Sequence, residues 1–499
     1  MTRFSTVLPA IFCLACGLLA GCVTPYGDEP KYRPASMDRI GVDDTAPPAG
    51  GESNAPSGTA APAGTAAPAG ALTVPGAATE PMPLTLDECL QLAHQNSRSL
   101  QIADRRVLIA QARVTEAWSN FVPKLSASGR FETRSNDRGG KLGTTEFVMG
   151  DQEVFSGGIH ALVPLYTFGR VRNLGDAESL RSEVAEFDAQ RTLQNLDLAV
   201  SAAYFRILEA EKIRGVVDDS ILVVTRQMEI SRDFYTQGLV AKTDVLSAEV
   251  QLANRRQERI QAHNNAQLAT ATLNRLMGID VDRPTRVADV LEMPPWRGSY
   301  QGVLRAAIER RPDLEALKHR IEIARADWRF TRASNLPYLY GFGDYSYNSD
   351  SFLLNKDWLA AGVVLEFTFF DVTNYLKMRR QKLEIAEAVD LHDDRVDDVV
   401  LEVKRTFLNV REAAERIPVA RKAIEEAEEN LRMIRDQYSQ GLVTVTDVLI
   451  EEDRRSRARS NYYQALYDYH DSFARLTNVI AGKPPEEGSR FPGQEAETN

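Results

Sequence analysis

Apolar residues in the C-terminal half of the chain recur at alternating steps of four and three positions. This heptad-like stripe predicts long helices that pack as coiled coils. It slips in phase at Ile417, beside Pro418. Residues 170–238 follow the same pattern and would form a helix about 100 Å long, several times the ~30 Å apolar thickness of a bilayer. The stripe comprises Val396, Val400, Val403, Phe407, Val410, Ala414, Ile417, Ala420, Ile424, Ala427, Leu431, Ile434 and Tyr438. Shorter helices are predicted over 86–120, 242–277, 302–334 and 445–480.

Two stretches in each half alternate apolar and polar residues with a period of two, which is typical of strands. They cover 125–133, 155–165, 338–348 and 358–369, and polar loops at 135–152 and 349–356 separate the members of each pair. Strands of about ten residues with one apolar face and an aromatic border fit a membrane β-barrel. Pro123, Pro164 and Pro337 mark the predicted changes between helix and strand, because proline interrupts regular backbone hydrogen bonding.

One twelve-residue stretch occurs twice. Residues 235–246 read Y-T-Q-G-L-V-A-K-T-D-V-L, and residues 438–449, at an offset of 203, match them at nine of twelve positions. Gly238 and Gly441 suit the left-handed conformation that ends a helix. Thr243 and Thr446 are predicted to cap the next helix, with Asp244 and Asp447 at the positive end of its dipole. Each copy therefore predicts the tip of a long helical hairpin.

A second alignment makes the chain a tandem duplication. Residues 86–125 align without gaps to 300–339 at an offset of 214, and the two copies are predicted to span 83–298 and 299–482. The eleven-residue difference between the two offsets must lie in the strands and loops between the aligned segments.

The N-terminus predicts export and lipid attachment. Arg3 precedes an apolar run at 7–19, too short to span a membrane, which leads into L-A-G-C at Leu19 to Cys22. This resembles the bacterial lipobox, in which the leader 1–21 is removed and Cys22 is acylated; the alternative is an ordinary signal peptide. In lipoproteins of this kind, an aspartate directly after the cysteine favours retention at the inner membrane. This chain has Val23 there, so the resemblance points to the outer membrane. Residues 22–82, rich in Pro, Ala and Gly, are predicted to be a disordered tether, and 483–499 a disordered tail.

Composition excludes several classes of function. The formal net charge of −11 argues against a nucleic-acid partner, which requires a basic surface. Sequence signatures of metalloproteases, serine hydrolases, phosphate-binding loops and calcium loops are missing, and the six histidines have no spacing suited to a metal. The acidic run at 390–398 is interpreted as a solvated helix face. The chain is therefore predicted to be neither an enzyme nor a binder of a metal or another cofactor.

Four strands are too few to cross a membrane alone. Hydrocarbon tolerates no unpaired sheet edge, and the smallest single-chain barrels have about eight strands. Copies of the chain must therefore close the sheet together, which predicts an oligomer.

The chain resembles the TolC-like outer-membrane efflux family, in its lipoprotein branch that works with resistance-nodulation-division pumps. The resemblance rests on the duplication, on P-L-Y-T-F-G-R at 164–170, and on the two G-L-V-x-x-T-D-V-L tips. It implies a mainly α fold in which three chains form a homotrimer with a 12-stranded barrel in the outer membrane. The helices would continue as a barrel across the periplasm, and their tips would meet an adaptor (membrane fusion protein) bound to the inner-membrane pump.

The resemblance also implies a gate at the tips, held between neighbouring hairpins and lined by acidic side chains. Its members would be Thr243, Asp244, Tyr438 and Asp447; alternatively, the two aspartates only favour helix starts. Adaptor contact is expected at Gly238, Leu239, Val240, Gly441, Leu442 and Val443. Some members of the family carry a basic residue where Val443 stands and an acidic one where Ile450 stands. Glu451 and Glu452 follow, and the pattern does not assign their faces.

The expected function is a passive outer-membrane exit duct of a tripartite efflux pump. The first alternative is the same duct serving type I protein secretion, and the lipobox favours efflux over it. The second alternative, of a different class, is a periplasmic coiled-coil scaffold or adaptor without a pore, which would not need paired, aromatic-bordered strands.

Overall fold

The computed structural model of the chain describes residues 83–135, 139–148, 150–290, 298–350, 353 and 355–482. The predicted leader, Cys22, the whole of the predicted tether and the C-terminal tail lie outside these residues. None of the described helices combines the length and the apolar character that a membrane-spanning helix requires.

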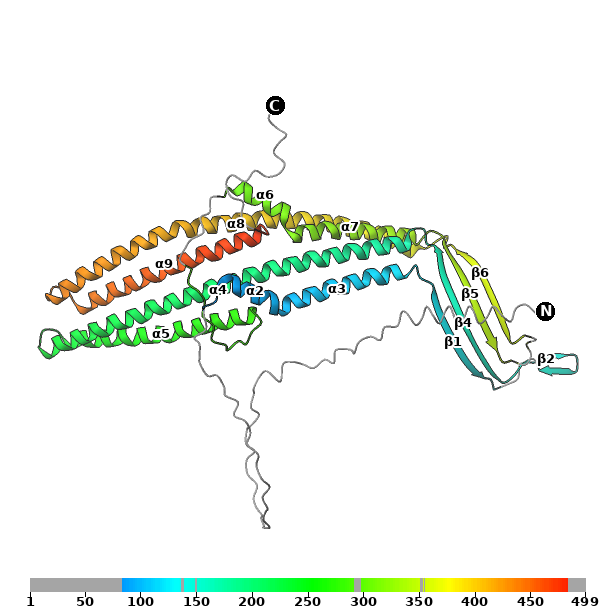
Figure 1. Cartoon of the computed structure of the whole chain (residues 1–499), viewed down its shortest axis with the longest axis horizontal. Helices are drawn as coiled ribbons and strands as arrows, with labels where there is room; N and C mark the ends of the chain where they lie inside the picture. The colour runs from blue at the N-terminus through cyan, green and yellow to red at the C-terminus, as the bar shows by residue number, and fades with distance from the viewer. Residues whose placement is uncertain are drawn as a thin grey trace, which may run out of the picture. The chain divides into compact units, whose positions relative to one another are not determined.

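Two long helical hairpins dominate the fold (Figure 1). The first consists of α4 (Arg170–Thr236) and α5 (Lys242–Leu276), and the second of α8 (Val372–Ser439) and α9 (Val445–Val479). These bounds confirm the helices that the heptad-like stripe predicts. The two hairpins pack on each other mainly through α4 and α9. Two weak helix formers lie within the long helices, Gly215 in α4 and Pro418 in α8, at the same offset of 203 that separates the tips.

The helical segment that precedes the strands in each half is divided in two, so the continuous helices predicted over 86–120 and 302–334 are wrong. The first segment forms α2 (Leu86–Asn96) and α3 (Arg98–Ser119), and the second forms α6 (Tyr300–Arg310) and α7 (Pro312–Ala333). Arg311 is extended (φ −74°, ψ 123°) because proline at the next position disfavours the helical conformation. Ser97 adopts nearly the same angles (φ −64°, ψ 123°) without a following proline.

The breaks fall at the same relative place in both halves, because Ser97 and Arg311 are separated by the alignment offset of 214.

Four antiparallel strands form one sheet in the order β1-β4-β5-β6. They are β1 (Lys124–Thr133), β4 (Glu153–Tyr166), β5 (Tyr338–Asn348) and β6 (Asp357–Glu366), which confirms the four predicted strands. Pro123 and Pro337 stand directly before β1 and β5, as predicted. Pairing of β4 with β5 joins the two halves, and β1 and β6 are the edges of this sheet in the described chain.

Pro164 does not mark a change from strand to helix. It lies inside β4, where the register against β5 shifts between Pro164 and Tyr166. Proline has no N–H to donate to the ladder, so it is tolerated at such an irregularity. The chain turns into α4 at Phe168 (φ 49°) and Gly169 (φ 82°), both in the left-handed region.

A small additional hairpin interrupts the loop predicted over 135–152. It consists of β2 (Gly139–Leu142) and β3 (Thr145–Val148), whereas residues 349–356 connect β5 to β6 without a further strand among the described positions. The longer first connection accounts for the eleven-residue difference between the two alignment offsets.

A buried ionic cluster lies where the break between α6 and α7 meets α8. The Arg311 side chain is fully buried and donates to both carboxylate oxygens of Asp313, at 3.0 and 2.8 Å, and to Glu402 at 2.8 Å. Arg395 also donates to Asp313, at 2.8 Å. Burial acts to raise the pKa of Asp313, but the hydrogen bonds from the two arginines outweigh it and hold that pKa well below its usual range.

Candidate functional site

The two hairpin tips are the candidate functional site, and glycine shapes both. Gly238 (φ 72°) and Gly441 (φ 71°) are left-handed, which confirms the predicted conformation. Their N–H groups donate to the carbonyls of Tyr235 and Tyr438, each at 3.0 Å. A Cβ at either position would have no neighbour within 4 Å, so the backbone angle and not crowding calls for glycine.

The predicted capping threonines are wrong. The N-cap residues are Ala241 for α5 and Thr444 for α9, so Thr243 and Thr446 lie inside the first turns of these helices. The twelve-residue stretches differ at this point, with alanine in the first and threonine in the second. Of the two N-cap residues, only Thr444 has a side chain that can cap its helix. The prediction placed both caps two residues too late, because it relied on the T-D pair that both copies share.

Asp447 is bound to this cap. Its carboxylate accepts hydrogen bonds from the Thr444 hydroxyl at 2.7 Å and from the Thr444 N–H at 2.8 Å. These two bonds, the side-chain one being stronger, lower the pKa of Asp447. The carboxylate is therefore ionised at neutral pH and stays half-buried at the start of α9. Asp244 occupies the matching place in α5, where Ala241 has no hydroxyl to donate.

Tyr438 is buried between the two hairpins of one chain. Its ring stacks on Phe234 at a centroid distance of 5.8 Å, and its hydroxyl lies 3.1 Å from the Ser231 hydroxyl. It belongs to a core cluster that includes Val224 and Leu431. The structure therefore places Tyr438 in packing within the chain, apart from the more exposed Thr243, Asp244 and Asp447.

The outermost side chains of the tips are apolar. Leu239 and Leu442 are 66% and 70% exposed, one on each tip. Val240 and Val443 are half-buried, and Val443 packs against the cluster around Tyr438. Each tip thus presents one leucine to its surroundings on a compact turn.

Glu451 and Glu452, whose faces the pattern left open, both point into the protein. Glu452 is 2% exposed and forms ion pairs with Arg455 at 2.8 Å and with Arg435 of α8 at 3.5 Å. Burial raises its pKa. Glu451 accepts from Asn430 of α8 and from Arg454. In the sequence, these ion pairs are indicated only by the spacing, since Glu451 and Glu452 each stand three residues before an arginine, Arg454 and Arg455.

No group of three or more histidine, cysteine, aspartate and glutamate side chains in the described part of the chain is arranged to hold a metal ion. The aspartates of the acidic run in α8 are exposed, and two of them, Asp393 and Asp398, pair with His392 and Arg395. The chemistry of the tips is therefore that of packing, charge and hydrogen bonding.

Comparisons with known proteins agree with this geometry. The family described as outer membrane efflux protein matches residues 89–279 and 303–482. The outer membrane protein TolC of Vibrio cholerae is 23% identical over 401 residues, 78% of this chain and 89% of that protein. The alkaline protease secretion protein AprF of Pseudomonas aeruginosa is 24% identical over 322 residues, 62% of this chain and 65% of its own length. The crystal structure of the Campylobacter jejuni outer membrane channel CmeC covers 80% of this chain and 87% of its own, with a TM-score of 0.71 and 15% identity.

Proposed function

This chain belongs to the outer membrane efflux protein family, and we propose that it forms the outer-membrane exit duct of a tripartite efflux pump. The duct is passive, opens at its periplasmic tips and catalyses no reaction. The observation that carries this proposal is the four-stranded sheet, whose edge strands β1 and β6 have no partner in the described chain. Because a membrane requires closed hydrogen bonding, three chains complete a 12-stranded barrel, the number three following from the family.

The two faces of the sheet support this assignment. The register aligns Ala127, Ile159, Tyr345 and Leu359 across the four strands on the apolar face, which suits lipid. The other face carries a polar row, in which His160 lies 2.8 Å from Asp344 and 3.3 Å from the Ser128 hydroxyl. Such a row suits a water-filled lumen.

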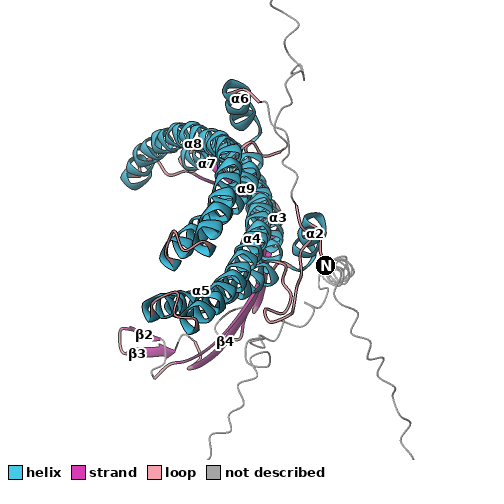
Figure 2. Ribbon diagram, turned by 90° about the vertical axis from the view of Figure 1, so that its left-hand side faces the viewer, coloured by secondary structure: helices cyan, strands magenta, loops and turns pink. Residues whose placement is uncertain are grey.

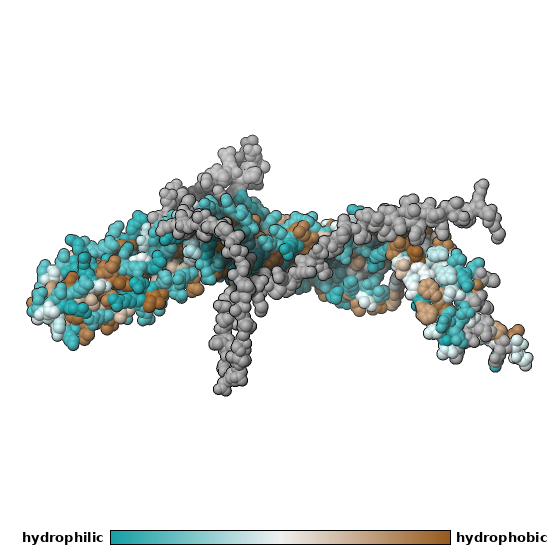
Figure 3. Space-filling model, turned by 60° about the horizontal axis from the view of Figure 1, so that its bottom comes forward, coloured by the Kyte–Doolittle hydropathy of each residue, from teal (hydrophilic) through white to brown (hydrophobic). Residues whose placement is uncertain are grey.

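The helices offer matching edges for assembly. Figure 2 shows them following a curve, with α8 towards one end and α5 towards the other. Exposed apolar side chains run along one side of α8 for its whole length: Val372, Leu376, Leu383, Leu401, Leu408, Val419 and Met433. A shorter stripe on α5 comprises Leu246, Val250, Ile260 and Leu268. Apolar patches also stand among polar ones on the face in Figure 3. We propose that these stripes pack between neighbouring subunits and close the helical barrel.

Tandem duplication explains why one chain carries two equivalent hairpins. The family model matches twice, and α2 and α6 have 11 residues each, as α3 and α7 have 22. The two copies are proposed to span 83–298 and 299–482.

The tips are the proposed gate and the docking point for a periplasmic adaptor, which links the duct to an inner-membrane resistance-nodulation-division transporter. Thr243, Asp244 and Asp447 would form the gate lining. Tyr438 would instead hold the two hairpins of one subunit together. Leu239 and Leu442 would make the main contacts with the adaptor, and Val240, Val443 and the tip glycines would shape the turn that presents them. A lipid-modified Cys22 would anchor each chain in the outer membrane.

Type I protein secretion is a second candidate, because AprF is by its name a protease secretion protein. A strain lacking the gene separates the two. Loss of resistance to small toxic compounds with intact protein secretion supports efflux, and the reverse supports secretion.

Purified protein tests the duct itself. We expect a mass of three chains and discrete single-channel conductance in planar bilayers. A monomer without conductance would favour the periplasmic scaffold instead. Leu401→Glu, in the middle of the α8 stripe, should weaken the trimer more than Leu391→Glu, an equally exposed position about a quarter turn away.

A further inference from the structure

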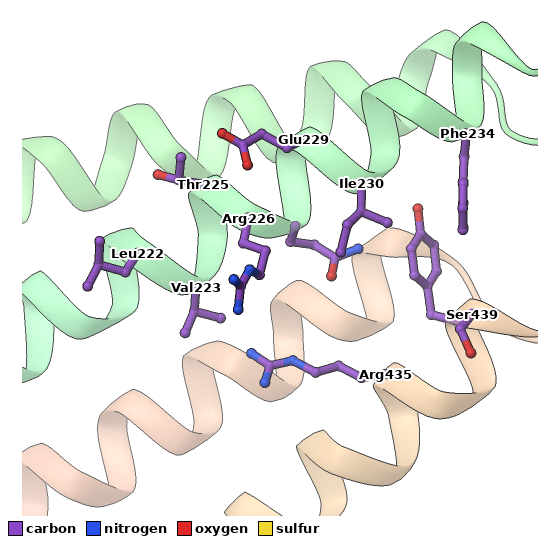
Figure 4. Close-up of a pocket in the computed structure, with 11 residues that line it drawn as sticks. Leu222, Val223, Thr225, Arg226, Glu229, Ile230, Phe234, Arg435 and Ser439 are labelled. Atoms are coloured by element: carbon purple, nitrogen blue, oxygen red, sulfur yellow. The ribbon is translucent and has the colours of Figure 1, made fainter.

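A cavity of about 610 Å³ lies between the two hairpins, close to their tips. Residues 222–234 of α4 form one wall, and residues 435–439 of α8 form the other (Figure 4). This volume falls in the range that accommodates drug-sized molecules.

Two arginines from different hairpins line the cavity. Figure 4 shows Arg226 of α4 and Arg435 of α8 directed towards the same space, with the Glu229 carboxylate pointing away from them. Arg435 has one acidic neighbour, Glu452, at 3.5 Å. Arg226 forms no hydrogen bond or ion pair within the described part of the chain. Burial lowers the pKa of Arg435, Glu452 opposes this, and the positive charges of Arg455 and, to a smaller extent, Arg226 lower it further. Two positive side chains directed into the same space favour a bound anion.

A buried amide in the same cavity lacks a partner. Gln227 is 6% exposed, and its Nε2 group has no hydrogen-bond acceptor among the described residues. A buried donor that stays unpaired costs about 1–3 kcal/mol, so nearly all such groups in proteins are paired. This Nε2 group has almost no accessible surface, so a rotation of the amide would be needed for it to donate to an acceptor bound in the cavity.

The remaining walls are apolar. Leu222 and Ile230 line the cavity on α4, and the Phe234 ring closes it towards the tip. Leu222 is 70% exposed, so its side chain is accessible to a bound molecule. Cationic donors beside an apolar wall select a ligand that has both a negative head and an apolar body.

We propose that this cavity binds a small amphipathic organic anion. A carboxylate or sulfonate accepts hydrogen bonds from Arg226 and Arg435, and from Gln227 once its amide has rotated, and the apolar body lies against Leu222, Ile230 and Phe234. Because the ligand contacts α4 and α8 together, it connects the two hairpins of one subunit.

Subunit assembly as proposed above leaves the cavity open. On a helix of 3.6 residues per turn, Arg435 lies on the opposite side of α8 from Leu401 and Val419 of the exposed stripe. A neighbour packed on that stripe therefore does not cover Arg435.

The test is calorimetric titration of the full chain in lipid nanodiscs with 2-naphthoate, and with neutral 2-naphthamide as the matched compound. We expect saturable naphthoate binding that Arg226→Gln weakens about tenfold, the effect of one charge-assisted hydrogen bond. Arg226→Lys, which keeps the charge, should retain most of the affinity. Binding of naphthamide should be weak and equal in all variants, and empty nanodiscs provide the blank.

Arg432→Gln is the control on α8, since Arg432 pairs with Glu429 and does not line the cavity. It should bind naphthoate like the unmodified chain. Equal naphthoate affinity in Arg226→Gln and Arg432→Gln, or no saturable binding to the unmodified chain, would overturn the proposal. Arg226 is exposed and unpaired, so its replacement leaves the fold intact, which circular dichroism checks.

Discussion

Replacing Arg311 by leucine tests whether the buried ionic cluster holds α7 to α8. The substitution removes three short hydrogen bonds, two to Asp313 and one to Glu402. Loss of one partner from a buried ion pair typically costs about 3–5 kcal/mol, because the other charge stays buried. Here Asp313 keeps Arg395 at 2.8 Å, and Glu402 is 37% exposed. We therefore expect the low end, about 3 kcal/mol.

Hydrogen–deuterium exchange of the protein in nanodiscs measures this loss of stability for each helix separately. Backbone amides of α7, and of α8 around Glu402, should exchange roughly 100-fold faster in Arg311→Leu, because each 1.4 kcal/mol is about tenfold. Arg320→Leu is the matched control on α7. Arg320 is half-exposed and lies 3.4 Å from Asp188, so its loss should cost about 0.5 kcal/mol.

The pH dependence follows from the lowered pKa of Asp313. A carboxyl whose folded pKa is depressed stabilises the fold above its unfolded pKa, about 3.9, and loses this contribution as pH falls through the folded value. The difference between the unmodified chain and Arg311→Leu should therefore be constant from pH 7 to 5 and shrink only below about pH 4. If Arg311→Leu exchanges no faster than Arg320→Leu, the cluster does not stabilise this contact.

Four further predictions concern the anchor and the tips. Cys22→Ser should abolish radiolabelled palmitate incorporation, and normal labelling would refute the lipidation site. Asp447→Asn should weaken block of the channel by trivalent cations; unchanged block would mean that the acidic ring lies elsewhere. Thr444→Ala should destabilise the start of α9 by about 1 kcal/mol, seen as faster amide exchange in its first turn, and undisturbed exchange there would contradict the capping role. Gly441→Ala should cost about 1 kcal/mol through its left-handed angle and lower the unfolding temperature as much as Gly238→Ala does, since neither Cβ would meet a neighbour.

Local periodicity predicted the long helices, the four strands and the glycine tips, because each depends on neighbouring residues alone. The division of the shorter helices was partly readable, since Pro312 requires an extended residue before it, but Ser97 carries no such signal. The burial of Tyr438 and Glu452 was not readable, because it depends on which helix lies opposite. Repetition misled at the caps, where the two copies differ at Ala241 and Thr444.

Strand patterns had a similar limit. Alternation located β1, β4, β5 and β6, yet the β2–β3 hairpin has only four residues in each strand, too few for a period of two to stand out. Pro164 was placed at a boundary because proline often ends an element, whereas a shift in the register lets β4 continue past it.

Gly215 and Pro418 lie at the same distance from the tips of the two long helices and make both helices easier to bend there. Proline removes one hydrogen bond from the α8 helix, and glycine weakens α4 at the same distance from its tip, where an added Cβ would meet no neighbour within 4 Å. From that level to each tip is about 35 Å of helix. Bending of α4 and α8 at this level would move the two tips together, while the sheet and the Arg311 cluster beyond it keep their geometry.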